Sequence, residues 1–548
     1  MKTTHKAFLM SAALAAAGLA GMVGQTSAST TYTWTGAGSD NLWSDSNNWL
    51  SVTKGGNGAP QSSDTSIVAF TYGTSNNTPD ASAGYTLHQV LFQNSNSYTL
   101  TGSDLSFGVG TGTNGYITDE ATSNETINNN LDVAPTGSGG YLTVGNESSG
   151  TLTLGGTIST NATTPGRLFL QSSTGTGAVV ASGTLSGKFY QFTVGQYEGT
   201  STTTLVNLTG NNSNFSAENM TVWTGILELS SANALGTTNT EILLNSGLGT
   251  GNPTLLTNAA MTVSNEIIVQ SPTSMPTSPS TLGVNTIGGK GAYTSTFSGT
   301  IYMGYPYGLQ TSPRVDTPLD LTADAGGTVT FSGNLLEPTY LNNVSINSNV
   351  TKIGTGTVIL SGSGNNYQGT TEVQAGTLLV NGTLLSGGGT VTVDSGATLG
   401  GTGTIDRSVA VFTGGILSPG DAVGTFTLSS LSLANGSNLA FTLGSSSDLV
   451  STDALTLGTS VALTVTQGTG FGLGTYKLID YTSLVDNSSG FSGWTVSGLS
   501  VGEIGVFSLS GSEVNLTVES SSIPEPSALG LLALGSLGIL AVRRRRSA

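Results

Sequence analysis

The 548-residue chain lacks cysteine and carries few charges. Lys, Arg, Asp and Glu make up 8% of its residues, against about 25% in ordinary soluble proteins. Without cysteine there are no disulfides and no thiolate metal ligands. The only histidines are His5 and His88, too few for a multi-histidine metal site, and His88 is expected to be structural or superficial.

Positive charge is also scarce between the two ends of the chain. Setting aside Lys2, Lys6, the four C-terminal arginines and Glu525 leaves 8 basic and 30 acidic residues, a net charge of −22. Such an acidic protein repels phosphate backbones, which excludes nucleic acid as a partner. Acidic side chains can attract Ca²⁺, but the sequence contains no Asp-rich calcium loop, so no cofactor is predicted.

Long amphipathic helical patterns are absent as well, and short β patterns take their place. Runs such as Tyr141–Gly145, Thr151–Gly155 and Thr390–Asp394 alternate Thr or Tyr with Val or Leu and end in turn residues. Nearly 500 residues of this pattern exceed one sandwich or barrel, leaving either sandwiches in series or a β-solenoid. A solenoid of coils of roughly 20 to 25 residues, stacked about 4.8 Å apart, hydrogen-bonds every internal edge.

The N-terminus has the pattern of a secretory signal peptide. Lys2 and Lys6 precede an apolar stretch over residues 7–23, and Thr26-Ser27-Ala28 supplies small residues suited to signal peptidase. We predict cleavage after Ala28. An uncleaved membrane anchor is the alternative.

The C-terminus has three parts in order. Pro524-Glu525-Pro526 is followed by an apolar run over 528–542 and by Arg543, Arg544, Arg545 and Arg546. The run predicts a single short transmembrane helix of some 22 Å, whose arginines would stay on the cytoplasmic side. An ordinary membrane anchor is the alternative interpretation.

These three parts resemble the PEP-CTERM sorting signal of exopolysaccharide-producing Gram-negative bacteria. The resemblance implies an exosortase-type processing enzyme as partner and attachment to the membrane through the helix before processing. It also implies export to the cell envelope, the cell surface or the extracellular matrix.

An internal repeat lies over residues 351–382 and includes Asn365, Asn366, Tyr367, Gly369 and Gly376. A looser copy runs over 208–236. The pattern resembles the autotransporter-associated β-strand repeat of bacterial passenger domains, which implies a right-handed parallel β-helix. The C-terminal membrane barrel of full autotransporters is not recognised, so their export route is not carried over.

The repeat residues suggest local roles. The Asn365-Asn366 amides suit a turn that satisfies backbone groups and could stack as a ladder between coils. Tyr367 and Phe215 would cover or fill a coil, with sugar stacking by Tyr367 as the alternative. Gly369 and Gly376 are expected at corners with positive φ.

Three of the five tryptophans, Trp34, Trp43 and Trp49, follow the predicted signal peptide. We expect them to cap the first coil, because a solenoid must cover its exposed apolar end. Sugar stacking is again the alternative.

Acid/base catalysis would have to use carboxylates, and the candidates are Asp119-Glu120 and the pair Asp448 and Asp453, placed in a Ser-rich turn. We therefore expect a non-enzymatic, exported structural or adhesive protein associated with exopolysaccharide. A polysaccharide lyase or glycoside hydrolase on the same scaffold is the alternative, and a Ca²⁺-dependent adhesin is a third possibility.

The predicted fold is all-β, a right-handed parallel β-helix with one C-terminal transmembrane helix. The predicted organisation divides the chain into four parts: a signal peptide (1–28), a β-rich region that begins the solenoid (29–200), a solenoid with repeats (201–522) and the sorting tail (523–548).

Overall fold

The computed structural model describes residues 29–521 apart from 52–55, 64, 73–76, 110–113, 136–139, 161–162, 172–176, 196–203, 237–239, 246–251, 271–282, 305–316, 339–346 and 422. This part is all-β, and its one helix is the short 3-10 turn η2 (Ser46–Asn48). It contains no helix long and apolar enough to span a membrane. Ala28 and the predicted span over 528–542 lie outside the described residues.

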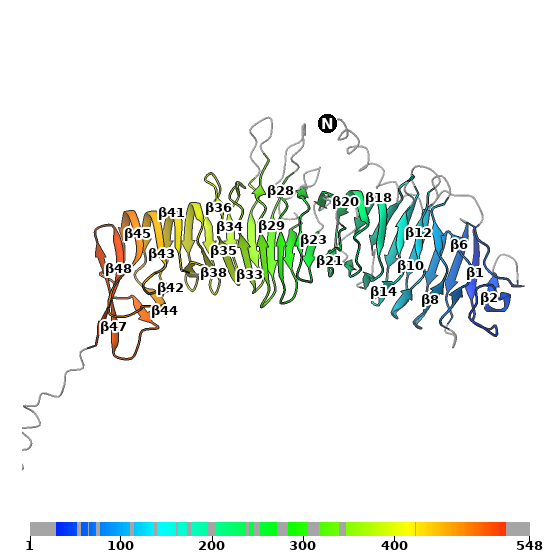
Figure 1. The fold of residues 1–548 in the computed structure, drawn as a ribbon, viewed down its shortest axis with the longest axis horizontal. Coiled ribbons are helices and arrows are strands. Elements are labelled where there is room, and N and C mark those ends of the chain that lie inside the picture. The colour runs from blue at the N-terminus through cyan, green and yellow to red at the C-terminus, as the bar shows by residue number, and fades with distance from the viewer. Residues whose placement is uncertain are drawn as a thin grey trace, which may run out of the picture.

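Parallel strands stack into ladders that run the length of an elongated body (Figure 1). Sheet 1 pairs its members in chain order: β1 (Thr30–Trp34), β4 (Ser66–Phe70), β7 (Gln89–Phe92), β10 (Asn114–Asp119), β13 (Tyr141–Asn146), β16 (Arg167–Gln171), β18 (Leu185–Val194), β20 (Phe215–Val222), β22 (Ile242–Asn245), β25 (Ile267–Gln270), β28 (Ile301–Met303) and β31 (Leu335–Leu336).

Sheet 2 is the longest ladder and joins 17 parallel strands. They are β5 (Asp80–Ala81), β8 (Thr99–Gly102), β11 (Glu125–Ile127), β14 (Thr151–Leu154), β17 (Ala178–Ala181), β19 (Leu205–Leu208), β21 (Ile226–Leu229), β23 (Thr254–Thr257), β26 (Asn285–Gly289), β29 (Leu319–Ala323), β32 (Val350–Ile353), β34 (Thr371–Val373), β37 (Val391–Val393), β39 (Thr404–Val411), β41 (Thr425–Leu433), β43 (Leu449–Leu457) and β45 (Gly474–Asp486).

Two shorter ladders follow the sheet 2 strands, sheet 3 in the N-terminal coils and sheet 4 in the later coils. Sheet 3 joins β6 (Tyr85–Leu87), β9 (Leu105–Phe107), β12 (Leu131–Val133) and β15 (Ile158–Thr160), then the first residues of β18 and β20. Sheet 4 joins β24 (Thr262–Val263), β27 (Thr294–Phe297), β30 (Thr328–Phe331), β33 (Thr357–Leu360), β35 (Thr377–Val380), β38 (Thr398–Gly401), β40 (Ile416–Pro419), β42 (Ser437–Leu443), β44 (Val461–Gln467) and β46 (Thr495–Ser497). This arrangement of stacked parallel strands is that of a β-solenoid.

The alternating sequence pattern explains how each strand sits. Side chains alternate across a strand, so in β14 the apolar Leu152 and Leu154 are buried while Thr151 and Thr153 are partly exposed. Each fully buried Leu or Val stabilises the folded chain by roughly 1.5 to 3 kcal/mol. One continuous apolar core extends from Tyr32 to Val518.

Coil length varies more than the expected 20 to 25 residues. Along sheet 2, Thr392 pairs with Ala410, 18 residues further on, whereas Thr286 pairs with Asp320, 34 residues further on. The ladder keeps its register, because the additional residues lie in the connections between strands. The ladders also pass the predicted boundary at residue 200 without a break, since β17 pairs with β19.

Antiparallel strands close both ends of the body. At the N-terminal end β1 pairs antiparallel with β2 (Trp49–Ser51), which pairs with β3 (Gly56–Asn57). At the other end β48 (Glu513–Ser520) pairs antiparallel with both β45 and β47 (Glu503–Ser510). Residues 514–518 alternate as a further solenoid strand would, but they belong to a closing hairpin, visible beside β45 in Figure 1.

Candidate functional site: the stacked repeat and the outer surface

Asn365 ties three successive coils together. Its Oδ1 accepts a hydrogen bond from the backbone N–H of Leu335 in the preceding coil at 2.9 Å. Its Nδ2 donates to the carbonyl oxygens of Gly362, at 2.8 Å, and of Thr383 in the following coil, at 2.9 Å. Asn365 thus satisfies backbone groups of β31 in the preceding coil and of β36 (Thr383–Leu384) in the following coil, because its own coil has no strand between them.

Asn212 makes the same contacts in the looser copy of the repeat. Its Oδ1 accepts from the N–H of Leu185 in the preceding coil, and its Nδ2 donates to the carbonyl of Ala234 in the next. Both asparagines are fully buried. The expected stack of asparagine side chains is not what these two residues form: their partners are backbone groups.

Tyr367 and Arg407 form a buried pair beneath the repeat. The Tyr367 ring is fully buried, its hydroxyl lies 2.6 Å from Thr371 Oγ1, and the Arg407 guanidinium lies 4.3 Å from its ring centroid. Arg407 also donates to the carbonyl oxygens of Tyr367 and Leu385 at 2.7 and 2.8 Å. Tyr367 therefore fills the coil as expected, and its burial rules out the alternative of a sugar-stacking platform.

The two repeat glycines are required for different reasons. Gly376 has φ +63°, as expected for a corner. Gly369 does not have positive φ, so that expectation is wrong. A Cβ atom at Gly369 would lie 2.2 Å from the carbonyl oxygen of Ser348, so close approach of two backbones requires glycine there.

Lys352 points into the core from β32. It alternates with the buried Val350, and its Nζ donates to the carbonyl oxygens of Ile353, Gly354 and Ala375 at 2.8 to 2.9 Å. Burial disfavours the charged form and lowers the pKa of Lys352 to about 8. Sequence reasoning missed both Lys352 and Arg407.

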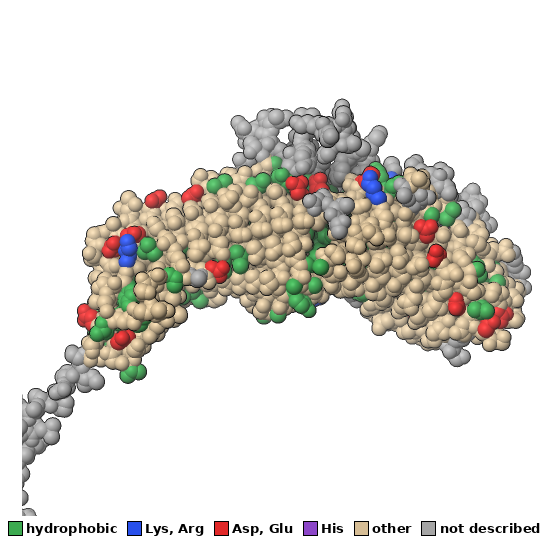
Figure 2. Space-filling model, viewed as in Figure 1, with side chains coloured by type: hydrophobic (Ala, Val, Ile, Leu, Met, Phe, Trp, Pro, Cys, Tyr) green, Lys and Arg blue, Asp and Glu red, His purple; other side chains and the backbone are tan. Residues whose placement is uncertain are grey.

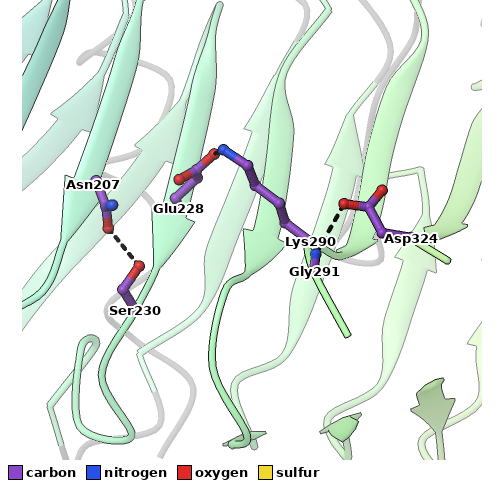
Figure 3. Close-up of polar contacts among 6 residues, drawn as sticks. All are labelled: Asn207, Glu228, Ser230, Lys290, Gly291 and Asp324. Atoms are coloured by element: carbon purple, nitrogen blue, oxygen red, sulfur yellow. Dashed lines mark hydrogen bonds and ion pairs between the residues drawn. The ribbon is translucent and has the colours of Figure 1, made fainter. Parts of the chain in front are cut away.

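On sheet 2, polar side chains also link coils that are not immediate neighbours. Lys290, just after β26, reaches across β23 to form an ion pair with the nearly buried Glu228 of β21 (Figure 3). Figure 3 shows two further contacts nearby, from the Ser230 hydroxyl to Asn207 and from the Gly291 N–H to Asp324, each at 2.8 Å.

The three N-terminal tryptophans lie together in the first coils. Their side chains are 0 to 1% exposed, and the ring centroids of Trp34 and Trp43 lie 4.9 and 5.4 Å from that of Trp49. Trp49 Nε1 donates to the Trp43 carbonyl at 2.9 Å. They lie where a cap was expected, and their burial excludes sugar stacking.

The two side chains of the carboxylate candidate Asp119-Glu120 point to opposite sides of the sheet, one into the core and one to the surface. Asp119 is fully buried, where desolvation and then the nearby Glu125 raise its pKa to about 7. Glu120 is exposed and accepts a hydrogen bond from Gln93 at 2.7 Å. No substrate on the surface can meet both carboxylates.

The second candidate is also divided. Asp448 is buried and accepts the backbone N–H groups of Gly424 and Thr442, at 3.0 and 2.6 Å, while burial raises its pKa. Asp453 is exposed within β43, not in the turn where it was expected. Asp448 thus closes a turn, as a capping carboxylate does.

In the described part of the chain, no group of three or more His, Asp or Glu side chains is placed to hold a metal ion. His88 is half-buried on the outer side of the N-terminal coils, in edge-to-face contact with Tyr116 at 5.4 Å. Figure 2 shows a surface with few charged side chains, most of them acidic.

Comparison with known families identifies both sequence patterns. Residues 350–380 match the passenger-associated-transport-repeat family, and residues 522–546 match the PEP-CTERM protein-sorting motif. The chain carries a PEP-CTERM sorting motif and a passenger-type repeat. Both resemblances expected from the sequence are therefore confirmed. The roles of Ala28, Pro524, Glu525, Pro526 and Arg543–Arg546 stay predictions, because these residues lie outside the described part.

A curated relative agrees with the repeat. The chain is 38% identical over 92 residues to the adhesin BmaC autotransporter of Brucella suis biovar 1 (strain 1330). That match covers 17% of the chain and 3% of the relative. The sorting motif implies processing by an exosortase-type enzyme, and the matches together point to an exported cell-surface protein of a Gram-negative bacterium.

Proposed function

We propose that this protein is a structural and adhesive rod, a right-handed parallel β-helix held at the cell surface or in the extracellular matrix in association with exopolysaccharide. The observation that carries the proposal is the ladder of sheet 2, which continues without a break from β5 to β45 between antiparallel caps. Its 16 steps of about 4.8 Å span roughly 77 Å. Such a body separates its two ends and offers a long surface for many weak contacts.

Two further observations support an adhesive role. The matched relative is named as an adhesin, and the face of the body drawn in Figure 2 carries few charged side chains. In this proposal the apolar run over 528–542 spans the membrane until the sorting enzyme processes the tail.

The positions of the acidic residues favour this function over a polysaccharide lyase or hydrolase. A glycosidase needs two carboxyl groups that flank one bond, roughly 5 to 9.5 Å apart and both accessible. Asp119, at the end of β10, and Asp448, in a turn, are instead buried away from the surface.

The proposed function is tested in cells that lack the gene and are complemented with variants. Cells with the intact gene should keep the protein in the surface and matrix fractions and adhere. A chain without residues 524–548 should be found elsewhere and fail to restore adhesion. Unchanged surface retention would contradict the sorting assignment, and unchanged adhesion in cells without the gene would contradict the adhesive role.

The enzymatic alternative is tested on the purified protein with neutral and acidic glycans. We expect no new reducing ends or unsaturated products. Glycan cleavage that is lost in Glu120→Gln or Asp453→Asn, the two exposed candidates, would overturn the proposed function.

A further inference from the structure

A row of aromatic side chains runs along the outer face of sheet 1. His88, Tyr116, Tyr141, Phe169 and Tyr190 come from the coils of β7, β10, β13, β16 and β18, one from each of five successive coils. All five are partly exposed. Because the coils stack along the rod, the row lies parallel to its long axis (Figure 1).

Strand alternation places these rings outside. In β10 the neighbours of Tyr116, Gly115 and Ile117, are buried, and in β16 the neighbours of Phe169, Leu168 and Leu170, are buried. An apolar ring such as Phe169 at an outward position is unusual in a wall whose outward positions are mostly Thr, Ser, Asn and Gln.

The register sets the rings in a zigzag. Tyr116 and Phe169 both pair with Thr143, whereas Tyr141 pairs with Asn114 on one side and Arg167 on the other. Successive ring centroids from His88 to Phe169 are 5.3 to 6.3 Å apart in edge-to-face contacts. Arg167 continues the row, with its guanidinium 4.9 Å from the centroid of Tyr190.

Neutral polar groups flank the rings. In these strands the other outward side chains include Gln89, Thr118, Thr143 and Gln191, with Gln89 bonded to Thr118 and Gln191 to Thr193, both at 3.1 Å. The outward positions of β7, β10, β13, β16 and β18 hold no carboxylate. Partly exposed rings can pack against the apolar C–H face of a sugar, while the neighbouring amides and hydroxyls can hydrogen-bond with the hydroxyl groups at its edge.

We propose that this aromatic row, from His88 to Tyr190, binds an extended neutral polysaccharide that lies along the rod. The ring spacing is comparable to the length of one sugar unit, so successive units can each contact a ring. A neutral chain is favoured because the body carries a net charge of −22, which repels polyuronates. This inference rests on the proposed association with exopolysaccharide and names the surface and the class of glycan.

Edge-to-face packing between neighbouring strands also stabilises a sheet, so the test must separate binding from stability. Tyr116→Thr and Phe169→Thr, singly and together, remove rings but keep a residue that suits strands. Thr143→Arg keeps every ring and covers Tyr116 and Phe169 with a guanidinium. Tyr293→Thr and Phe412→Thr are matched controls, since these rings are 48% and 46% exposed elsewhere on the rod.

Binding is measured on the full chain by affinity electrophoresis in hydroxyethyl cellulose and by titration with cellohexaose, with alginate as the anionic comparison. We expect the wild-type protein and both controls to bind the neutral glycans and ignore alginate. Each single ring variant and Thr143→Arg should bind about tenfold more weakly, and the double variant should show no binding. Thermal unfolding of Thr143→Arg should match that of the wild type.

Binding by the double variant and by Thr143→Arg at wild-type strength would overturn the row as the site. Wild-type binding to alginate in place of the neutral glycans, or to neither, would also overturn it. In those cases the cell adhesion assay tests the proposed function separately. If adhesion still depends on the gene, the adhesive function is retained and only the aromatic row is rejected as the binding surface.

Discussion

Asn365 shows how one side chain continues a backbone ladder across a coil that has no strand on that side. Asn365→Ala removes an acceptor for the Leu335 N–H and a donor for two carbonyl oxygens in a buried position. We expect a loss of about 3 kcal/mol, since each buried group left without a partner costs about 1 to 3 kcal/mol. Urea denaturation measures this loss.

The matched control for Asn365 is its neighbour. Asn366→Ala removes one hydrogen bond, from the Glu337 N–H to Asn366 Oδ1, and should cost about 1 kcal/mol. Equal losses at the two positions would contradict the role assigned to Asn365.

The lowered pKa of Lys352 predicts that the free energy of unfolding depends on pH. Its pKa is about 8 in the folded protein against 10.5 for an ordinary lysine. Between these values the unfolded chain holds a proton that the folded chain does not, so stability rises with pH by up to about 1.4 kcal/mol per pH unit. Below pH 8 both states are protonated and the contribution is constant.

The test compares Lys352→Met with the wild type by urea denaturation between pH 7.5 and 10. The wild type should gain stability relative to this variant as pH rises above 8. Lys477→Met is the control: its carboxylate partners raise the pKa of Lys477, so its contribution stays constant until the pH approaches 10.5. A difference between wild type and Lys352→Met that does not change with pH would refute the buried position of Lys352.

Gly369→Ala tests the close approach of two coils. The added Cβ would meet the Ser348 carbonyl oxygen at 2.2 Å, so the coils must shift, and we expect a loss of about 2 kcal/mol or more. Gly58→Ala, where no atom lies within 4 Å, should change stability by less than about 0.5 kcal/mol. Thermal unfolding distinguishes the two, and a tolerated Gly369→Ala would mean that the coils are not in contact there.

The sequence predicted the repeat residues but not the buried charges. Asn365, Tyr367 and Gly376 stand in a recognisable repeat, so their positions could be assigned in advance. Lys352 and Arg407 occupy inward positions two residues from Val350 and Ile405, a signal that strand alternation offers. Alternation alone does not predict a cation there, because buried cations without carboxylate partners are rare.

At the level of strands and caps, the N-terminal tryptophan cluster should stabilise only the coils next to it. Each coil contacts its immediate neighbours, so stability in a solenoid is local. Trp49→Ala leaves a cavity in the first coils and should cost about 3 to 5 kcal/mol there. Hydrogen exchange should show lost protection in β1 and β4, and unchanged protection in β32 to β41.

Tyr72→Ala is the control for Trp49→Ala, because this ring lies in the same region and is 53% exposed. It should leave exchange unchanged in all strands. Uniform loss of protection along the whole body of Trp49→Ala would show that the coils unfold as one unit.

The alternation of apolar and polar residues predicts where strands lie, but it does not predict whether neighbouring strands run parallel or antiparallel. Residues 514–518 alternate as the solenoid strands do, yet β48 runs antiparallel to β45. Nothing in a period of two distinguishes a closing hairpin from another coil. The lengths of strands β39, β41 and β43 also do not follow from the sequence pattern, because each strand continues past a Ser position that is typical of a turn.

Across the whole molecule, the few basic side chains make contacts within the fold. Six of the eight basic residues of the body lie in the described part, and each contacts a carboxylate, a ring or backbone carbonyls; they are Arg167, Lys188, Lys290, Lys352, Arg407 and Lys477. On the face drawn in Figure 2, most of the few charged side chains are acidic. This charge distribution suits a body that associates with neutral chains and avoids nucleic acid.

Small-angle X-ray scattering of the exported body tests most directly whether the stacked coils form one rod. The ladder and its two caps predict a maximum dimension on the order of 100 Å and the scattering of an elongated particle. A compact globule of the same length would have a radius of gyration of about 23 Å and no rod-like regime. A globular profile, or that of a random chain, would contradict the rod and the adhesive role built on it.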